Sequence, residues 1–311
     1  MSVQVIHYPS ATGVGEIHAE IFRPVGIPWA VVQIAHGMAE HTGRYQKFAN
    51  YLCEKGVLVA MNDHAGHGKS FEELNHLGYF GHENGRTALI QDMKELHDQV
   101  VKEYPDIPYV LLGHSMGSFL ARAYASFHTT ELSACIFSGT AGKTRGVFLG
   151  RLVAKLEFIK NGPRKPSRLL HKLAFAGYNK RIKNARTEND WLSRDAAIVN
   201  TYNNDPLCGF YYTAEGMRDI FKVLSEISSP HWAKKVPAIP ILMISGDADP
   251  VGRYGKGVLQ VYKWLQKTRH TVTLLLYPGG RHEMLNETNR DEVYREVYAF
   301  LLKYFKMQAD M

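Results

Sequence analysis

The segment Gly113-His114-Ser115-Met116-Gly117 has the G-x-S-x-G spacing that can present a serine as a nucleophile. An apolar run at 109–112, typical of a strand buried on both faces, precedes it, and helix-forming residues follow from Met116. The glycines allow strand and helix to pass close together, so a strained turn can expose the Ser115 hydroxyl beside the free N–H groups of the helix start. Because glycine makes up about 7% of residues, the spacing alone arises by chance in about one chain in ten of this length. We predict that Ser115 is a nucleophile, and the prediction depends on its partners.

A base follows later in the chain. The apolar runs ILMIS and TLLLY end in the loops GDADPV (246–251) and PGGRHE (278–283), which gives the order Ser, Asp, His of a hydrolytic triad on a parallel sheet. Both loops follow strands, at the edge where the sites of open α/β sheets assemble. We predict that His282 takes the proton from Ser115 and returns it to the leaving group.

Two aspartates compete for the role of orienting acid, which holds the imidazole in the right tautomer and stabilises its charged form. Asp247 and Asp249 flank one turn, and both could reach inward. We favour Asp249 because Pro250 stiffens the loop after it, and we expect Asp247 to bind loop amides.

The oxyanion that forms during such a reaction needs two N–H donors. The loop HGMAEH (36–41) follows the third predicted strand, and Gly37 lets its backbone come close to the site. We predict that the N–H groups of Met38 and Met116 bind the oxyanion, each contributing about 3 kcal/mol. The other interpretation of HGMAEH is a plain turn with surface histidines. We expect His36, His41 and His114 to support loops rather than to take part in the chemistry.

Strand-like and helix-like segments alternate along most of the chain, which predicts an α/β protein with a mostly parallel eight-stranded sheet covered by helices on both faces. The first two strands are joined by ATGVG and predict a hairpin. The predicted strands are 2–8, 16–22, 29–35, 57–61, 109–112, 134–137, 239–244 and 272–276. The predicted helices around the sheet are 44–55, 88–103, the segment from 116, 257–267 and 290–305.

The alternation stops after Gly142 and resumes near residue 236. We therefore predict a core domain of residues 1–142 and 236–311 with a helical cap inserted at 143–235, whose helices lie at 147–159, 167–175 and 216–225. The formal net charge of +7 comes from this insertion, because residues 143–186 hold 13 Lys or Arg and one acid. The motif DWLSRD (190–195) predicts a cap hinge with a buried tryptophan.

The helix at 147–159 carries apolar residues at helical spacing opposite Arg151 and Lys155. We favour a cap helix that packs its apolar stripe onto the sheet domain. The alternatives are a helix that rests on an anionic membrane, and a basic pocket that attracts a phosphate-bearing or fatty-acid substrate.

Composition excludes several classes. Hydrophobic content of 45% and charged content of 22% are ordinary for a globular protein, and the three distant cysteines predict free thiols. Metal-ligand spacings and nucleic-acid motifs are absent from the sequence, so we expect no metal, no cofactor and no nucleic-acid partner. The N-terminus has no basic, apolar leader and the chain no apolar run of 18 residues, which predicts a cytoplasmic protein.

Five motifs in order, HGMAEH, DHAGHGKS, GHSMG, GDADPV and GGRHEMLNE, resemble those of the α/β-hydrolase family of monoacylglycerol lipases and lysophospholipases, which are serine-aminopeptidase-type hydrolases. The resemblance covers residues 15–142 and 236–305. It implies the α/β-hydrolase fold, a triad of Ser115, Asp249 and His282, oxyanion donors at Met38 and Met116, and a turn shaped by Asp63 and its neighbouring glycines. The insertion has no matching motif, so the resemblance implies ester hydrolysis more strongly than any particular lipid.

The leading hypothesis is therefore a cofactor-independent serine hydrolase that cleaves lipid-like carboxylic esters, such as monoacylglycerols or lysophospholipids, through an acyl-enzyme. An amidase or iminopeptidase would share sheet and triad, but it would need acidic cap residues to receive an amino terminus, and this cap is basic. A general short-chain carboxylesterase, a thioesterase or a perhydrolase are further alternatives. A dehalogenase or epoxide hydrolase would have aspartate in place of Ser115. A non-catalytic ligand-binding protein of the same fold is disfavoured by the complete triad.

Overall fold

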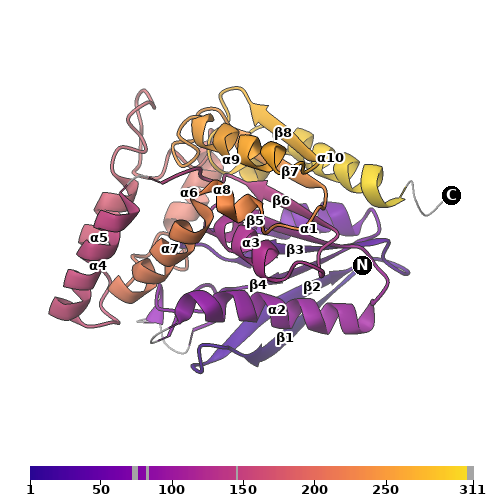
Figure 1. The fold of residues 1–311 in the computed structure, drawn as a ribbon, viewed down its shortest axis with the longest axis horizontal. Coiled ribbons are helices and arrows are strands. Elements are labelled where there is room, and N and C mark those ends of the chain that lie inside the picture. The colour runs from indigo at the N-terminus through magenta and orange to yellow at the C-terminus, as the bar shows by residue number, and fades with distance from the viewer. Residues whose placement is uncertain (72–75, 82–83, 145, 307–311) are drawn as a thin grey trace.

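The computed structural model describes residues 1–71, 76–81, 84–144 and 146–306. One eight-stranded sheet with the order β1-β2-β4-β3-β5-β6-β7-β8 runs through its middle (Figure 1). The strands from β4 to β8 in this order are parallel, while β1 pairs with β2 and β2 with β4 in antiparallel fashion, so the predicted sheet and hairpin are confirmed. The strands are β1 (Ser2–Pro9), β2 (Glu16–Arg23), β3 (Ala30–Ala35), β4 (Val57–Asn62), β5 (Tyr109–His114), β6 (Ala134–Ser138), β7 (Ile241–Gly246) and β8 (Val272–Tyr277).

The central strands are continuous apolar runs because helices cover both of their faces. Every residue of β3, β4 and β5 is buried. Side chains alternate between two cores: Val31 lies in the core beneath α2 (Gly85–Glu103), α3 (Met116–Phe127) and α9 (Lys256–Lys267), and Val32 lies in the core beneath α1 (Gln46–Cys53) and α10 (Arg290–Leu301). This layered arrangement is the α/β-hydrolase fold.

The segment between β6 and β7, called here the insertion (residues 143–235), is helical. It contains α4 (Val147–Asn161), α5 (Arg168–Phe175), α6 (Ala196–Asn204), α7 (Ala214–Ile227) and the short α8 (Pro230–Ala233). Figure 1 shows α4 and α5 side by side at one end of the molecule, beyond the layers of the core. Helix α6 was not predicted, and it begins where the Asp195 carboxylate accepts a hydrogen bond from the N–H of Ala197.

The expectation that α4 packs its apolar stripe onto the sheet domain is wrong for most of the stripe. Of its apolar residues, Val153 packs inward, whereas five are exposed: Phe148, Leu149, Leu152, Leu156 and Ile159. The partners of α4 are α7 and α5, and the helix lies on them rather than on the sheet. A membrane-spanning helix would have to be longer and more apolar than any in the described ranges.

Candidate active site

The turn between β5 and α3 holds Ser115 in a strained conformation. Its φ of 51° and ψ of −119° lie where residues other than glycine rarely occur. A Cβ on Gly113 would lie 2.2 Å from the carbonyl oxygen of Gly117, and one on Gly117 would lie 2.0 Å from that of Ala35. The sequence therefore turns sharply here because both flanking positions are glycine, and the geometry is that of a nucleophile elbow.

The loops after β7 and β8 bring an aspartate and a histidine together. Asp249 Oδ2 lies 3.0 Å from His282 Nδ1, and neither atom has another hydrogen-bonding partner in the described part of the chain. The carboxylate of Asp247 instead accepts a hydrogen bond of 2.7 Å from the N–H of Gly279. Asp249 is thus the partner of the histidine, and Asp247 binds a backbone amide of the loop, as predicted.

His282 is 1% exposed, and its surroundings favour the charged form of the imidazole. Burial by itself lowers the pKa of His282. The Asp249 carboxylate, with smaller contributions from Glu283 and Glu40, outweighs burial, so that the pKa is raised above its ordinary value. This arrangement stabilises the protonated imidazole, which a general base must form during the reaction.

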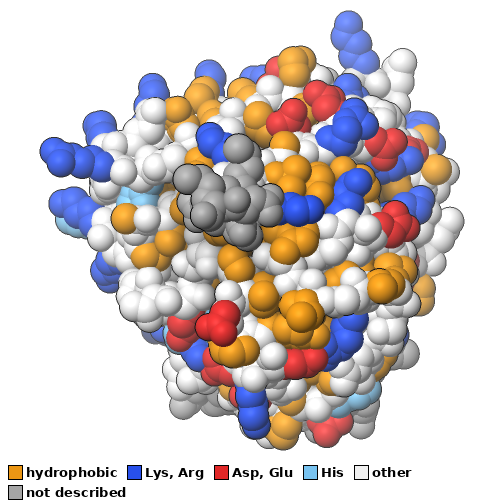
Figure 2. All heavy atoms as spheres, turned by 90° about the vertical axis from the view of Figure 1, so that its right-hand side faces the viewer, with side chains coloured by type: hydrophobic (Ala, Val, Ile, Leu, Met, Phe, Trp, Pro, Cys, Tyr) orange, Lys and Arg blue, Asp and Glu red, His pale blue; other side chains and the backbone are white. Residues whose placement is uncertain are grey.

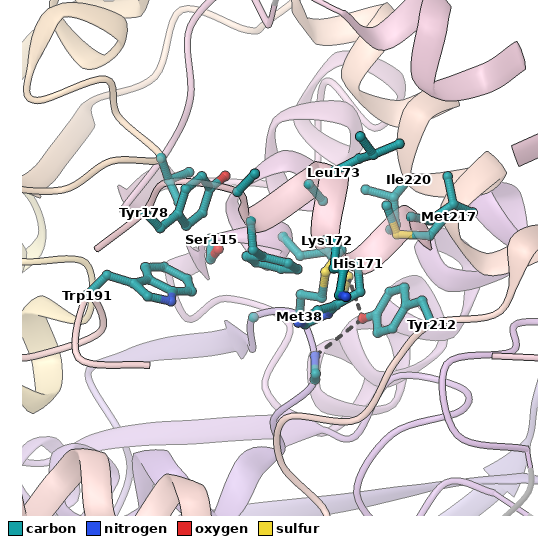
Figure 3. A pocket seen from close by; sticks show the side chains of 18 of the residues that line it. Met38, Ser115, His171, Lys172, Leu173, Tyr178, Trp191, Tyr212, Met217 and Ile220 are labelled. Carbon is teal, nitrogen blue, oxygen red and sulfur yellow. Dashed lines mark hydrogen bonds between the residues drawn. The ribbon is translucent and has the colours of Figure 1, made fainter. Parts of the chain in front are cut away.

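A cavity of about 890 Å³ opens above these residues and is lined by Ser115, Met38, Met116 and His282. Figure 3 shows Ser115 and Met38 at this space. The two predicted oxyanion donors and the serine therefore border the same space. Apolar side chains from the insertion form much of the remaining wall, among them Val153, Leu170, Leu173, Met217, Ile220 and Leu224. The size and lining are those of a site for an apolar small molecule.

Residues 26–289 match the family described as serine aminopeptidase, S33. The chain belongs to this hydrolase family. It is 29% identical to the monoacylglycerol lipase of Mycolicibacterium smegmatis, over 95% of this chain and 96% of that protein. It is also 29% identical to the monoglyceride lipase of Mus musculus, over 86% of this chain and 79% of that protein. Among solved structures, a thermostable carboxyl esterase from Bacillus coagulans in complex with glycerol has 35% identity and a TM-score of 0.92, over 98% of this chain and 99% of that one.

In this hydrolase the polar loops around the site are supported as predicted. His36 Nε2 accepts a hydrogen bond of 2.9 Å from the N–H of His64, and His41 Nε2 lies 2.9 Å from Asp205 Oδ2 in the insertion. The ring of His114 lies 4.7 Å from that of His282, and burial lowers the pKa of His114 to about 3, so it packs as a neutral ring.

The predicted turn at Asp63 is confirmed. Its two carboxylate oxygens accept hydrogen bonds of 2.8 Å from the N–H groups of Thr42 and Lys69. A Cβ on Gly68 would lie 2.1 Å from Asp63 Oδ2, so this glycine is required for the turn.

The sequence analysis did not predict what holds the loop that carries His282 (residues 278–283, called here the histidine loop). The Trp191 ring, predicted only to be buried, lies 4.9 Å from the His282 ring. The N–H of Glu283 donates to the carbonyl of Leu192 at 2.8 Å, so the DWLSRD segment is bound along the loop that carries His282. A second support, through Arg44, was also missed. Both contacts join segments far apart in the chain, so the sequence around each residue does not identify its partner.

Proposed function

We propose that the protein is a serine esterase that hydrolyses lipid-like carboxylic esters, with Ser115 as nucleophile, His282 as base and Asp249 as orienting acid. The observation that carries this proposal is the Asp249–His282 pair beside the strained Ser115, at the floor of a largely apolar cavity. The names of similar proteins support it: monoacylglycerol lipase, carboxyl esterase, and phospholipase YtpA of Bacillus subtilis, which is 24% identical over 89% of this chain and 96% of that protein.

In the proposed reaction, His282 Nε2 takes the proton of Ser115 as Oγ attacks the carbonyl carbon of the ester. The N–H groups of Met38 and Met116 bind the oxyanion of the tetrahedral intermediate. His282 then protonates the departing alcohol and leaves an acyl-enzyme. Water, activated by the same histidine, releases the carboxylic acid. Asp249 stays ionised throughout and stabilises the imidazolium.

The insertion, residues 143–235, acts in this proposal as a cap on a core of residues 1–142 and 236–311. Its apolar side chains from α4, α5 and α7 enclose the upper cavity, where the acyl chain of a lipid would lie. Figure 3 draws Leu173, Met217 and Ile220 around the space above Met38. Such a wall favours long acyl chains because each buried CH₂ contributes about 0.8 kcal/mol.

The cap surface fits an anionic membrane as the source of substrate. Phe148 and Ile159 of α4 are 83% and 68% exposed, and Leu173 of α5 is also exposed. Residues 143–186 add 13 basic side chains against one acid. The molecule's face opposite α4 and α5 instead intersperses apolar side chains with both acidic and basic ones (Figure 2). A surface that combines exposed apolar residues with one sign of charge is suited to lie on anionic lipid.

An aminopeptidase-like reaction, which the family's description raises, has less support. It would need a carboxylate free to bind an amino terminus. Of the acidic residues that line the cavity, Glu40 and Glu283 are both paired with Arg44, and Glu188 is exposed to solvent.

The decisive experiment measures product release from p-nitrophenyl butyrate, p-nitrophenyl palmitate, a 1-monoacylglycerol, lysophosphatidylcholine and an aminoacyl-naphthylamide, each with wild type and Ser115→Ala. We expect turnover of long-chain glycerol esters that falls about 10⁴-fold or more in the variant. Hydrolysis of butyrate alone would identify a general carboxylesterase. Turnover of the naphthylamide alone would replace the esterase proposal, and activity that survives Ser115→Ala would refute the mechanism.

A further inference from the structure

Three charged side chains are buried next to residues 36–41, the loop that carries the proposed oxyanion donor Met38 and is called here the oxyanion loop. Arg44 Nη1 donates to Glu40 Oε2 at 2.6 Å and to Glu283 Oε1 at 2.5 Å, while Nη2 donates to Glu283 Oε2 at 2.7 Å. The side chain of Arg44 is 9% exposed and those of both glutamates are 3% exposed. Two carboxylates and one guanidinium leave one net negative charge out of water, which is an expensive arrangement unless the geometry is specific.

Each carboxylate belongs to a loop that the proposed reaction uses. Glu40 Oε1 accepts hydrogen bonds from the Gly37 N–H at 2.5 Å and the Tyr45 hydroxyl at 2.6 Å, so it holds the backbone directly before Met38. Glu283 directly follows His282 in the chain. Arg44 thus joins the loop of an oxyanion donor to the loop of the base, across 239 positions of sequence.

The contact is rigid. A guanidinium that binds a carboxylate through two parallel hydrogen bonds fixes orientation as well as distance, which a lysine cannot do. The ring of Tyr202, from α6, lies 4.8 Å from the Arg44 guanidinium carbon, and its hydroxyl donates to the carbonyl of Ala39 at 3.1 Å. The cap therefore holds the same arginine and the same loop from above.

We propose that Arg44 is a positioning residue of the reaction, which sets the separation between the Met38 N–H and the His282 imidazole through Glu40 and Glu283. This inference rests on the proposed function. A displacement of about 1 Å in such a geometry can lower the rate about 100-fold without any loss of binding groups. Release of this contact therefore lowers kcat, with little change in KM for a small soluble ester.

A purely stabilising ion cluster would also be lost on substitution, but that loss would lower the free energy of unfolding without lowering kcat of the enzyme that stays folded. The pH profile adds a second measurement, because the charges of the cluster act on His282. The charged or titratable groups around His282 are Asp249, Glu283, Glu40 and His114, and Arg44 is bound to both glutamates. His282 has to be neutral to accept a proton, so kcat/KM falls as the pH drops through its pKa. Neutralising Glu283 removes a carboxylate that raises this pKa. Neutralising Arg44 leaves the charges of Glu40 and Glu283 without their cation, so the effect of these carboxylates on His282 should increase.

The test compares Glu283→Gln, Arg44→Gln and Arg44→Lys with wild type, using p-nitrophenyl butyrate over a pH series. We expect kcat to fall about 10- to 100-fold in both glutamine variants, with KM within about threefold. The acid limb of kcat/KM should move to lower pH in Glu283→Gln and to higher pH in Arg44→Gln. Arg44→Lys keeps the positive charge but loses the two parallel hydrogen bonds of the guanidinium. The acid limb of its kcat/KM profile should therefore stay in place, while its kcat should lie between those of Arg44→Gln and wild type.

Arg194→Gln is the matched control. Arg194 Nε donates to Glu287 Oε2 at 3.0 Å, just after the histidine loop in the chain, but does not join that loop to the oxyanion loop, so kcat and the acid limb should be unchanged. If Arg44→Gln does not fold, Glu283→Gln and Arg44→Lys test the positioning role in its place. Wild-type kcat in folded Glu283→Gln would overturn the inference, whether or not the acid limb of the pH profile moves. Absence of Ser115-dependent ester hydrolysis in the wild type would refute the proposed function instead.

Discussion

Asp247 and Asp249 show how a single loop gives two identical side chains different partners. Asp249 is fully buried and faces the Nδ1 of His282, while Asp247 closes the loop by accepting the N–H of Gly279. The Asp249 Oδ1 also accepts the N–H of Val251 at 2.8 Å, which fixes the carboxylate toward the histidine. The difference lies in backbone geometry rather than in residue type.

This pair of aspartates supplies a matched test of the proposed triad. Asp249→Asn preserves shape but removes the charge that stabilises the imidazolium and selects its tautomer, so we expect kcat for p-nitrophenyl butyrate to fall about 10⁴-fold. Asp247→Asn keeps the oxygen that accepts from Gly279, so kcat should stay within about threefold of wild type. Equal losses in the two variants, at temperatures where both are folded, would contradict the assignment of Asp249.

The residues of the proposed triad could be predicted from the sequence because each follows an apolar strand, and the parallel sheet brings those strand ends together. The elbow geometry at Ser115 and the partner of His282 agree with that prediction. Arg44 and Trp191 could not be found in this way, since their partners lie 239 and 91 positions away and tertiary packing alone brings them together. The only local hint is a glutamate inside each of the motifs HGMAEH and RHEM, where a buried loop would otherwise avoid charge.

At the scale of elements, the core strands and helices were predictable and the outer surface of the insertion was not. A continuous apolar run in an α/β protein predicts a strand that is buried on both faces. An amphipathic helix is less informative, because its apolar side can face either protein or lipid. Helix α4 turns it outward, and its only fully buried residue is Ala154. Hydrophobic spacing predicts a stripe but does not say what covers it.

The exposed stripe of α4 predicts reversible binding to anionic membranes. Phe148→Ser combined with Ile159→Ser removes two outward apolar side chains that do not line the cavity, so sedimentation with phosphatidylglycerol vesicles should weaken about 10- to 100-fold. Added salt should weaken the binding of wild type as well, because each basic residue near the surface contributes about 1 kcal/mol at low ionic strength.

The control pair is Val25→Ser with Ile27→Ser, on the loop before β3, where both side chains are more than 80% exposed. These changes remove similar apolar area from a site outside the insertion and its basic segment at 143–186, and vesicle binding should stay the same. Equal weakening by both pairs, or equal binding to neutral phosphatidylcholine vesicles, would argue against the cap surface as the membrane contact. A wild-type dimer that the Phe148 and Ile159 changes dissociate would mean that a second copy covers the stripe.

At the scale of the whole molecule, one buried arginine connects the insertion to the helix that follows the proposed nucleophile. Arg122 of α3 is fully buried, and its guanidinium donates to the carbonyls of Ala141 at 2.7 Å and Ile227 at 2.6 Å. These carbonyls lie just before the insertion begins and at the end of α7. The indole N–H of Trp232 in α8 donates to the carbonyl of Arg122 at 2.6 Å, and its ring lies 4.2 Å from the guanidinium carbon.

Because Arg122 holds both ends of the insertion, we expect the cap and the core to unfold together, with tryptophan fluorescence and far-ultraviolet circular dichroism giving coincident denaturant transitions. Arg122→Leu leaves the two buried carbonyls without this donor, and each unpaired group costs about 1–3 kcal/mol. The free energy of unfolding should therefore fall by about 2–6 kcal/mol, or the two transitions should separate as the cap detaches first. Arg23→Leu, which breaks a more exposed ion pair with Glu103, should cost about 1 kcal/mol or less. A loss in Arg122→Leu no larger than in Arg23→Leu, with transitions still coincident, would show that the insertion is held to the core by its other contacts.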